Sequence, residues 1–135
     1  MLKLIVGVMG TGKTKALISL VNGAAEKTSG SVVCIERGTK LNYEIKNSVR
    51  LIDTKEYDIS NANDLYGLCC GSYANNYDVT DIFIDSALKI CMNNMDEFKI
   101  FVTRFDAMLE RHNLNSVVTV SADISAFPEE LKKFL

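Results

Sequence analysis

The sequence has no long hydrophobic run. Its longest apolar stretches, at residues 4–9 and 117–120, are far shorter than the roughly 20 residues that a membrane-spanning helix needs. The amino-terminal residues also lack the apolar segment and the small-residue cleavage site of a signal peptide. We therefore expect a protein without a membrane span and with a cytoplasmic location.

Cysteine and histidine are scarce, and neither charge sign dominates. The single histidine, His112, follows a predicted helix on the surface and is assigned no role. With 15 basic and 17 acidic side chains the net charge is -2, which argues against broad, sequence-independent binding to nucleic acid but leaves room for a local basic patch. The four cysteines form no CxxC pair, and this spacing favours buried free thiols over a zinc site or a disulfide framework: Cys34, Cys69, Cys70 and Cys91.

The rest of the composition is that of an ordinary folded domain. Hydrophobic residues make up 47% of the 135 residues and charged residues 24%, and there is no repeat, low-complexity segment or linker. A chain of this length typically forms one domain. We expect a single domain over residues 1–135.

Hydrophobic periodicity predicts alternating strands and helices. Short apolar runs predict strands at residues 2–8, 31–36, 49–53, 79–85 and 116–121. Apolar residues three and four apart predict helices at residues 13–27, 61–75 and 95–112, with a short terminal helix near Pro128. Asn94 is the predicted N-cap of the longest helix, with Glu97 as its reciprocal partner. This alternation predicts a three-layer α/β/α sandwich around a mainly parallel sheet.

One segment matches the pattern G-x-x-x-x-G-K-[ST] completely, and it lies between a predicted strand and a predicted helix: Gly7, Val8, Met9, Gly10, Thr11, Gly12, Lys13 and Thr14. Glycines allow several backbone N–H groups to turn toward one anion, and the helix N-terminus adds its dipole. The pattern predicts a phosphate-binding loop for ATP or a similar nucleoside triphosphate. Lys13 is expected to contact the β- and γ-phosphates, and the Thr14 hydroxyl to bind Mg²⁺. The alternative is a glycine-rich turn without a ligand.

Two carboxylates end predicted strands at the edge where this loop also lies, if the strands are parallel. Asp85 follows the apolar run Ile82-Phe83-Ile84, as in a Walker B motif, and is expected to hold Mg²⁺ opposite Thr14. Glu36 ends the second strand and is a candidate general base for the water that attacks the γ-phosphate. The structural alternative for Asp85 is a helix cap. For Glu36 it is a salt bridge with Arg37 or a solvated loop.

Other polar residues are candidates at the same edge. Residues 37–47 are rich in charge and turn formers and are predicted to form an active-site loop. Ser121 and Asp123 follow the last strand and are possible sensors of the γ-position, with a plain turn as the alternative. Arg104 and Arg111 could serve a neighbouring subunit as arginine fingers, although solvated surface charge is the simpler interpretation.

The order of these motifs resembles the core of the RecA/KaiC-type ATPases. The resemblance rests on GVMGTGKT, VVCIE, IFIDS, a long amphipathic helix and VVTVSAD, and it covers nearly the whole chain. In that family a catalytic glutamate follows the second strand, and serine often follows the Walker B aspartate, which matches Glu36 and the pair Asp85-Ser86. The resemblance implies Mg²⁺-dependent ATP hydrolysis coupled to the assembly or movement of a partner, commonly in homo-oligomeric rings.

Two other functions fit the same motifs. The chain is also similar to the thymidine kinase family, which would make it a nucleoside kinase. That family has a glutamate where this chain has Ser86, and a cysteine zinc ribbon that this sequence does not contain. The third possibility is a nucleotide-dependent switch that binds without hydrolysis, with Glu36 serving only the structure.

Overall fold

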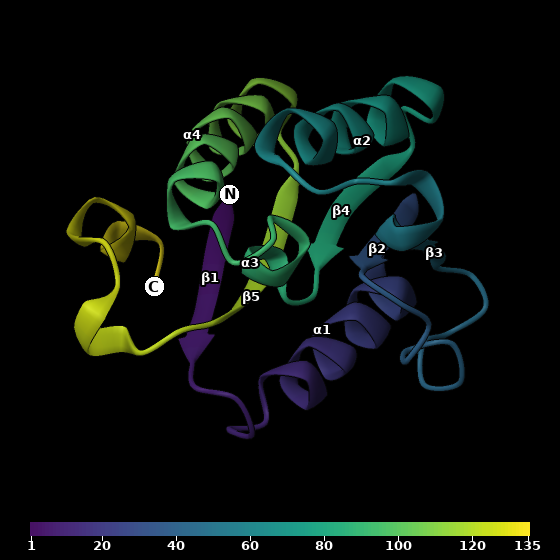
Figure 1. The fold of residues 1–135 in the computed structure, drawn as a ribbon. Helices are drawn as coiled ribbons and strands as arrows, with labels where there is room; N and C mark the ends of the chain where they lie inside the picture. Colours follow the sequence, from purple (N-terminus) through teal and green to yellow (C-terminus); the bar gives the residue numbers. More distant parts are fainter.

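A single five-stranded sheet forms the centre of the computed structural model, which describes residues 1–135 (Figure 1). The strands lie in the order β1-β5-β4-β2-β3, and every neighbouring pair is parallel. The predicted α/β fold with a mainly parallel sheet is therefore confirmed. The strands are β1 (Leu2–Gly7), β2 (Ser31–Glu36), β3 (Arg50–Asp53), β4 (Val79–Ile84) and β5 (Asn115–Ser121).

Helices cover both faces of this sheet. Helix α1 lies on one face, whereas α2 and α4 lie side by side on the other (Figure 1). The α-helices are α1 (Lys13–Lys27), α2 (Ala62–Asn75), α3 (Ala87–Ile90) and α4 (Met95–His112). The sequence did not predict α3, and the short terminal helix is made of two 3₁₀ segments, Ile124–Ala126 and Glu129–Phe134. No helix in the structure is both long and apolar enough to cross a bilayer.

The alternation of side chains along the strands divides the core into two parts. In β2, Val33 and Ile35 face α2 and α4, while Val32 and Cys34 face α1. The cluster on the α2 and α4 face contains 25 buried residues, and the cluster on the α1 face contains 8. All four cysteines are free thiols, and three of them are buried.

The caps of α2 and α4 are linked through Glu97. The side chain of Asn94 accepts a hydrogen bond from the Glu97 amide at 3.1 Å, which confirms the predicted N-cap. The prediction that Glu97 returns this bond to Asn94 is wrong, because its Oε1 accepts from the amide of Ala62 at 2.9 Å instead. Glu97 thus satisfies a free donor at the start of the neighbouring helix rather than at its own.

The strand order places three chain segments at one edge of the sheet. Strand β5 lies between β1 and β4, with Gly7 beside Ser121 and Ile84 beside Val118. Because all strands are parallel, the residues that follow β1, β4 and β5 emerge together. Ligands of open α/β sheets typically bind at this carboxyl edge.

Gly30, just before β2, is a position where the fold requires a residue without a side chain. A Cβ atom at Gly30 would overlap the carbonyl oxygen of Asp78, which accepts the amide of Ser31 at 2.8 Å. We predict that Gly30→Ala lowers the free energy of unfolding by about 1–3 kcal/mol, because the backbone must shift to relieve the overlap.

Gly23→Ala is the matched control for urea unfolding. Gly23 lies inside α1, and an added Cβ there meets no atom within 4 Å. Alanine should stabilise this helix by about 0.5–1 kcal/mol. Equal stability of Gly30→Ala and the wild type would contradict the close approach of Gly30 to Asp78.

Candidate functional site

The loop between β1 and α1 turns a row of free backbone donors toward the carboxyl edge. Gly10 and Gly12 have φ angles of 85° and 81°, in the left-handed region that favours glycine. None of the backbone N–H groups from Val8 through Lys15 donates a hydrogen bond within the chain. The N–H groups of a helix's first turn lack intrahelical partners, and they commonly bind an anion.

The first turn of α1 carries positively charged side chains, although it is the positive end of the helix dipole. Side chains of Asn61 and Asn94 cap α2 and α4. The N-cap residue of α1 is Gly12, which has no side chain to cap the helix, and the first turn of α1 has no acidic residue. Lys13 and Lys15 lie there instead. Positive charge at the positive end of a helix dipole is unfavourable. A bound anion would compensate both the lysine charge and the dipole.

The side chain of Lys13 folds back over the loop that precedes it. Its Nζ donates to the carbonyl of Val8 at 2.9 Å, and the Thr11 hydroxyl donates to the same oxygen at 2.8 Å. Lys13 forms no salt bridge with a carboxylate. Its ammonium group is therefore held at the loop by the Val8 carbonyl, with its charge unpaired.

The Thr14 hydroxyl contacts Asp85, the residue that follows β4. Thr14 Oγ1 lies 3.1 Å from Oδ1 and 3.3 Å from Oδ2 of Asp85, whose residue is 5% exposed. The amide of Asp85 donates to Ile35 on β2 at 2.8 Å, which holds its backbone. A hydroxyl and a carboxylate so close together form an oxygen donor set that fits Mg²⁺, which usually takes one or two protein ligands and completes its shell with phosphates and water.

Thr119 on β5 orients Asp85, a role that the sequence did not indicate. Its hydroxyl donates to Asp85 Oδ1 at 2.8 Å and accepts from the amide of Ser86 at 2.7 Å, where φ is 56°. One buried hydroxyl thus joins β5 to both residues that follow β4. The only signal in the sequence was a polar residue inside the run VVTVS, and its partner depends on a strand register that the sequence does not show.

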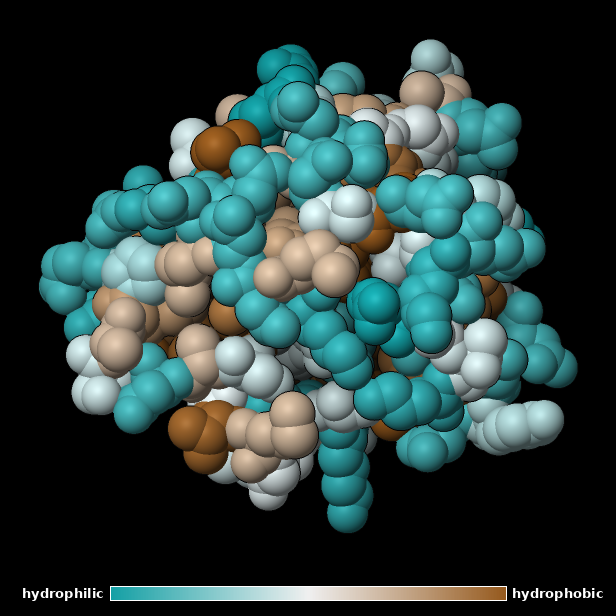
Figure 2. All heavy atoms as spheres, in the orientation of Figure 1, coloured by the Kyte–Doolittle hydropathy of each residue, from teal (hydrophilic) through white to brown (hydrophobic).

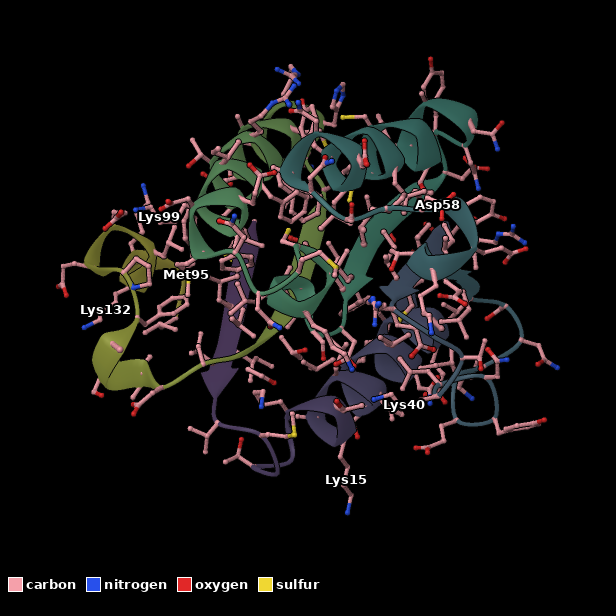
Figure 3. All side chains as sticks on the ribbon, viewed as in Figure 1. Lys15, Lys40, Asp58, Met95, Lys99 and Lys132 are labelled. Carbon is pink, nitrogen blue, oxygen red and sulfur yellow. The ribbon has the colours of Figure 1, made fainter.

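A cavity of about 380 Å³ opens beside the loop, and its charged lining is entirely basic. Besides the loop residues, it is lined by Lys15 of α1, Lys40 from the segment after β2, Ser121 after β5, and three residues around α3: Ser86, Lys89 and Asn93. None of the lysines that line it forms a salt bridge. Figure 3 shows Lys40 beside α1 on the side of the segment after β2, whereas Lys15 extends away from the fold. This is the local basic patch that the balanced net charge permits.

The tip of the loop is apolar. Met9 is 85% exposed and Val8 53%, and hydrophobic atoms are visible at the lower edge of Figure 2 on an otherwise mainly hydrophilic face. Of these two side chains, Met9 also lines the basic cavity. The cavity therefore offers apolar contact at its rim and positive charge along its walls.

The structure places Glu36 near this cavity but not in its wall. Its residue is 2% exposed, and Oε2 accepts from the amide of Leu41 at 3.0 Å. Burial raises the pKa of Glu36, and the negative charge of Asp85 adds to that effect, while the Leu41 hydrogen bond and the charge of Lys40 oppose it. The salt bridge with Arg37, which was one structural alternative for Glu36, is not formed.

The two predicted sensor residues are placed differently. Ser121 lines the cavity. The Asp123 carboxylate instead accepts from the amide and the hydroxyl of Ser125, at 2.9 and 2.8 Å, and caps a 3₁₀ segment. The Ser125 amide and hydroxyl hold the pKa of Asp123 below its usual value. Only Ser121 is brought beside the Gly7–Thr14 loop.

Arg104, one of the two suggested arginine fingers, is engaged within the chain. Its guanidinium donates to Asn63 at 2.7 Å and lies over the ring of Tyr66, 4.0 Å from the ring centroid. Both partners belong to α2, so Arg104 ties α4 to α2. Arg111 is exposed near the end of α4.

A larger cavity, of about 600 Å³, lies at the opposite edge of the sheet. It runs between α2 and the amino ends of β2 and β4, and its lining includes Gly67, Gly71 and Arg50. Arg50 is its only charged residue, and no run of free amides faces it. Its chemistry is unlike that of the smaller cavity, where the free donors and the lysines converge.

No protein-family model matches this chain, and no curated protein matches it. The function therefore has to be inferred from the chemistry of the site.

We predict that Thr119→Val lowers the free energy of unfolding by about 1–3 kcal/mol, because it leaves the Ser86 amide without its acceptor and Asp85 without one donor. Urea unfolding of the purified chain measures the effect.

Ser116→Ala is the control on the same strand. Ser116 is as buried as Thr119, but its hydroxyl has no hydrogen-bond partner. Its removal should change stability by less than about 0.5 kcal/mol. A Thr119→Val variant as stable as Ser116→Ala would show that the hydroxyl does not hold Asp85 and Ser86.

Proposed function

We propose that this chain binds a nucleoside triphosphate with Mg²⁺ at the Gly7–Thr14 loop and hydrolyses it, as a RecA/KaiC-like ATPase whose turnover serves the assembly or movement of a partner. The site between β1, β4 and α1 supports this proposal through its free amides, its unpaired lysines and its Thr14–Asp85 contact. Each of these features favours a polyphosphate that carries a divalent cation.

The observation that carries the proposal is the start of α1. The N–H groups from Val8 through Lys15 have no acceptor, and lysines occupy the first turn of a helix that has no cap and no acidic residue there. For the folded chain alone this arrangement is unfavourable, because donors and positive charge accumulate at the positive end of a dipole. A bound phosphate chain satisfies the donors and neutralises the charge together.

The roles of individual residues follow from their chemistry. Lys13 would stabilise negative charge on the β- and γ-phosphates, and the loop amides would orient the phosphate chain. Thr14 and Asp85 would hold Mg²⁺, which supplies charge neutralisation on the terminal phosphates. Thr119 would keep Asp85 oriented, and Ser121 would offer a hydroxyl beside the loop.

Loss of the Lys13 ammonium should abolish most of the binding. We predict that Lys13→Ala weakens the affinity for Mg²⁺-ATP by at least about tenfold without reducing stability, because Lys13 contributes charge rather than packing. Isothermal titration calorimetry with ATP, ADP and GTP, each with and without Mg²⁺, measures this.

The control is Lys27→Ala, which removes the same charge from the last turn of α1, away from the cavity. It should bind nucleotide as the wild type does. Unchanged affinity in Lys13→Ala would remove the phosphate role from this residue, and a wild-type chain that binds none of the three nucleotides would refute the proposal.

A second candidate function, a switch that binds nucleotide without hydrolysis, is favoured by one observation. The Glu36 carboxylate is buried and already accepts a hydrogen bond from the amide of Leu41, so in this conformation it is engaged in holding the backbone. Its raised pKa, by contrast, makes Glu36 a better proton acceptor and favours hydrolysis.

Glu36→Gln separates these two functions. For an ATPase with Glu36 as its general base, we predict that the variant retains nucleotide affinity and releases phosphate roughly a hundredfold more slowly. Phosphate release is measured with and without an added nucleoside, so that transfer to the nucleoside would reveal a kinase. A wild type that binds ATP but releases no phosphate would instead be a switch.

A further inference from the structure

Lys40 lies on a segment that two buried or partly buried carboxylates hold in place. The amide of Gly38 donates to Asp53 Oδ1 at 2.7 Å, and the amide of Leu41 donates to Glu36 Oε2 at 3.0 Å. Gly38 has a φ angle of 117°, which a residue with a side chain rarely adopts. These bonds fix the backbone on both sides of Lys40.

Side-chain packing anchors the same segment. Leu41 is 2% exposed and, with Ile45, belongs to the core cluster under α1. Asn22 of α1 adds two more bonds, to the carbonyl of Glu44 and the amide of Lys46, both at 2.9 Å. Lys40 is therefore an exposed cation on a well-held support, and its side chain lines the phosphate cavity beside α1 (Figure 3).

The strand order places Lys40 on the far side of Asp85 from the phosphate loop. Across the sheet, β1 is followed by β5, β4 and then β2. The loop follows β1, Asp85 follows β4, and Lys40 lies on the segment after β2. A triphosphate whose inner phosphates lay on the loop amides would extend its terminal group toward Asp85, because Thr14 and Asp85 would hold the Mg²⁺ that neutralises the terminal phosphates. Lys40 is the cation that the segment after β2 adds to the cavity lining, and it has no carboxylate within salt-bridge distance.

We propose that Lys40 contacts the terminal phosphate from within the same chain and makes the site discriminate a nucleoside triphosphate from a diphosphate, with Glu36 as the residue that positions it. This inference rests on the proposed nucleotide binding. It gives Glu36 a role that does not depend on proton transfer: its carboxylate oxygen holds the Leu41 amide and so keeps Lys40 at the cavity.

The test compares two affinities in each variant of the full chain. Calorimetry with Mg²⁺ and β,γ-imido-ATP, which resists hydrolysis, gives the triphosphate affinity, and Mg²⁺-ADP gives the diphosphate affinity. Lys40→Ala should lose about tenfold more affinity for the triphosphate than for ADP, as expected for one charge-assisted contact. Lys40→Arg should restore most of this difference.

Lys15→Ala is the matched control, since it removes an equal charge from the same cavity. Its side chain extends away from the fold (Figure 3), so it should weaken both nucleotides by the same small factor. Equal losses for both nucleotides in Lys40→Ala, or no loss, would overturn the role of Lys40 while leaving nucleotide binding intact. Failure of the wild type to bind either nucleotide would instead refute the proposed function.

Two substitutions of Glu36 test the positioning role. Glu36→Gln keeps an oxygen that accepts from Leu41 and should retain the preference for the triphosphate, even if hydrolysis slows. Glu36→Ala removes the acceptor and should lose the preference to about the same extent as Lys40→Ala. A Glu36→Ala variant that folds and still prefers the triphosphate would show that Glu36 does not position Lys40.

Discussion

The hydroxyl of Thr119 is the contact on which the geometry of this site depends. It lies on the strand between β1 and β4, and it bonds at once to the Asp85 carboxylate and the Ser86 amide. Asp85 in turn accepts from Thr14 at the start of α1. Three elements that are distant in the sequence are thereby linked by hydrogen bonds, of which the one between Thr119 and Asp85 is buried, where such bonds are costly to break.

The start of α1, in contrast to these contacts, is an arrangement that the folded protein alone does not stabilise. Lysines and free amides gather at the positive end of α1, and no carboxylate pairs with them. The other long helices begin with asparagine caps and acidic residues, so the chain has the usual means of stabilising a helix start. Local departures from these rules typically mark functional sites, where a ligand supplies the missing interactions.

Local patterns in the sequence were sufficient to predict the helices and strands. The positions of the predicted strand ends were sufficient to predict that Asp85 lies beside Thr14. Two-residue alternation and helical spacing are properties of short segments, and parallel strands place their following residues at one edge. Thr119 and Lys40 could not be found in this way. Thr119 meets Asp85 only through the register of β4 with β5, and Lys40 reaches the cavity only because tertiary contacts fold its segment against α1.

The C-terminal part of the site shows a related limit. Asp123 and Ser121 are close in the sequence, and both follow a strand at the correct edge, yet a local hydrogen bond to Ser125 turns Asp123 away. Likewise, Glu97 was expected to cap its own helix and caps α2 instead. In both cases several acceptors compete for nearby donors, and only the full packing decides which pair forms.

The two faces of the sheet are held unequally, with 25 buried residues under α2 and α4 but 8 under α1. Cooperative units with fewer buried contacts open at lower free energy, so amide hydrogens of α1 and of the segment around Leu41 should exchange with solvent before those of α4. Leu41 and Ile45 belong to that smaller cluster, and α1 begins directly after the glycines of the Gly7–Thr14 loop. A ligand that contacts both α1 and the segment around Leu41 would therefore slow amide hydrogen exchange across this whole face of the sheet.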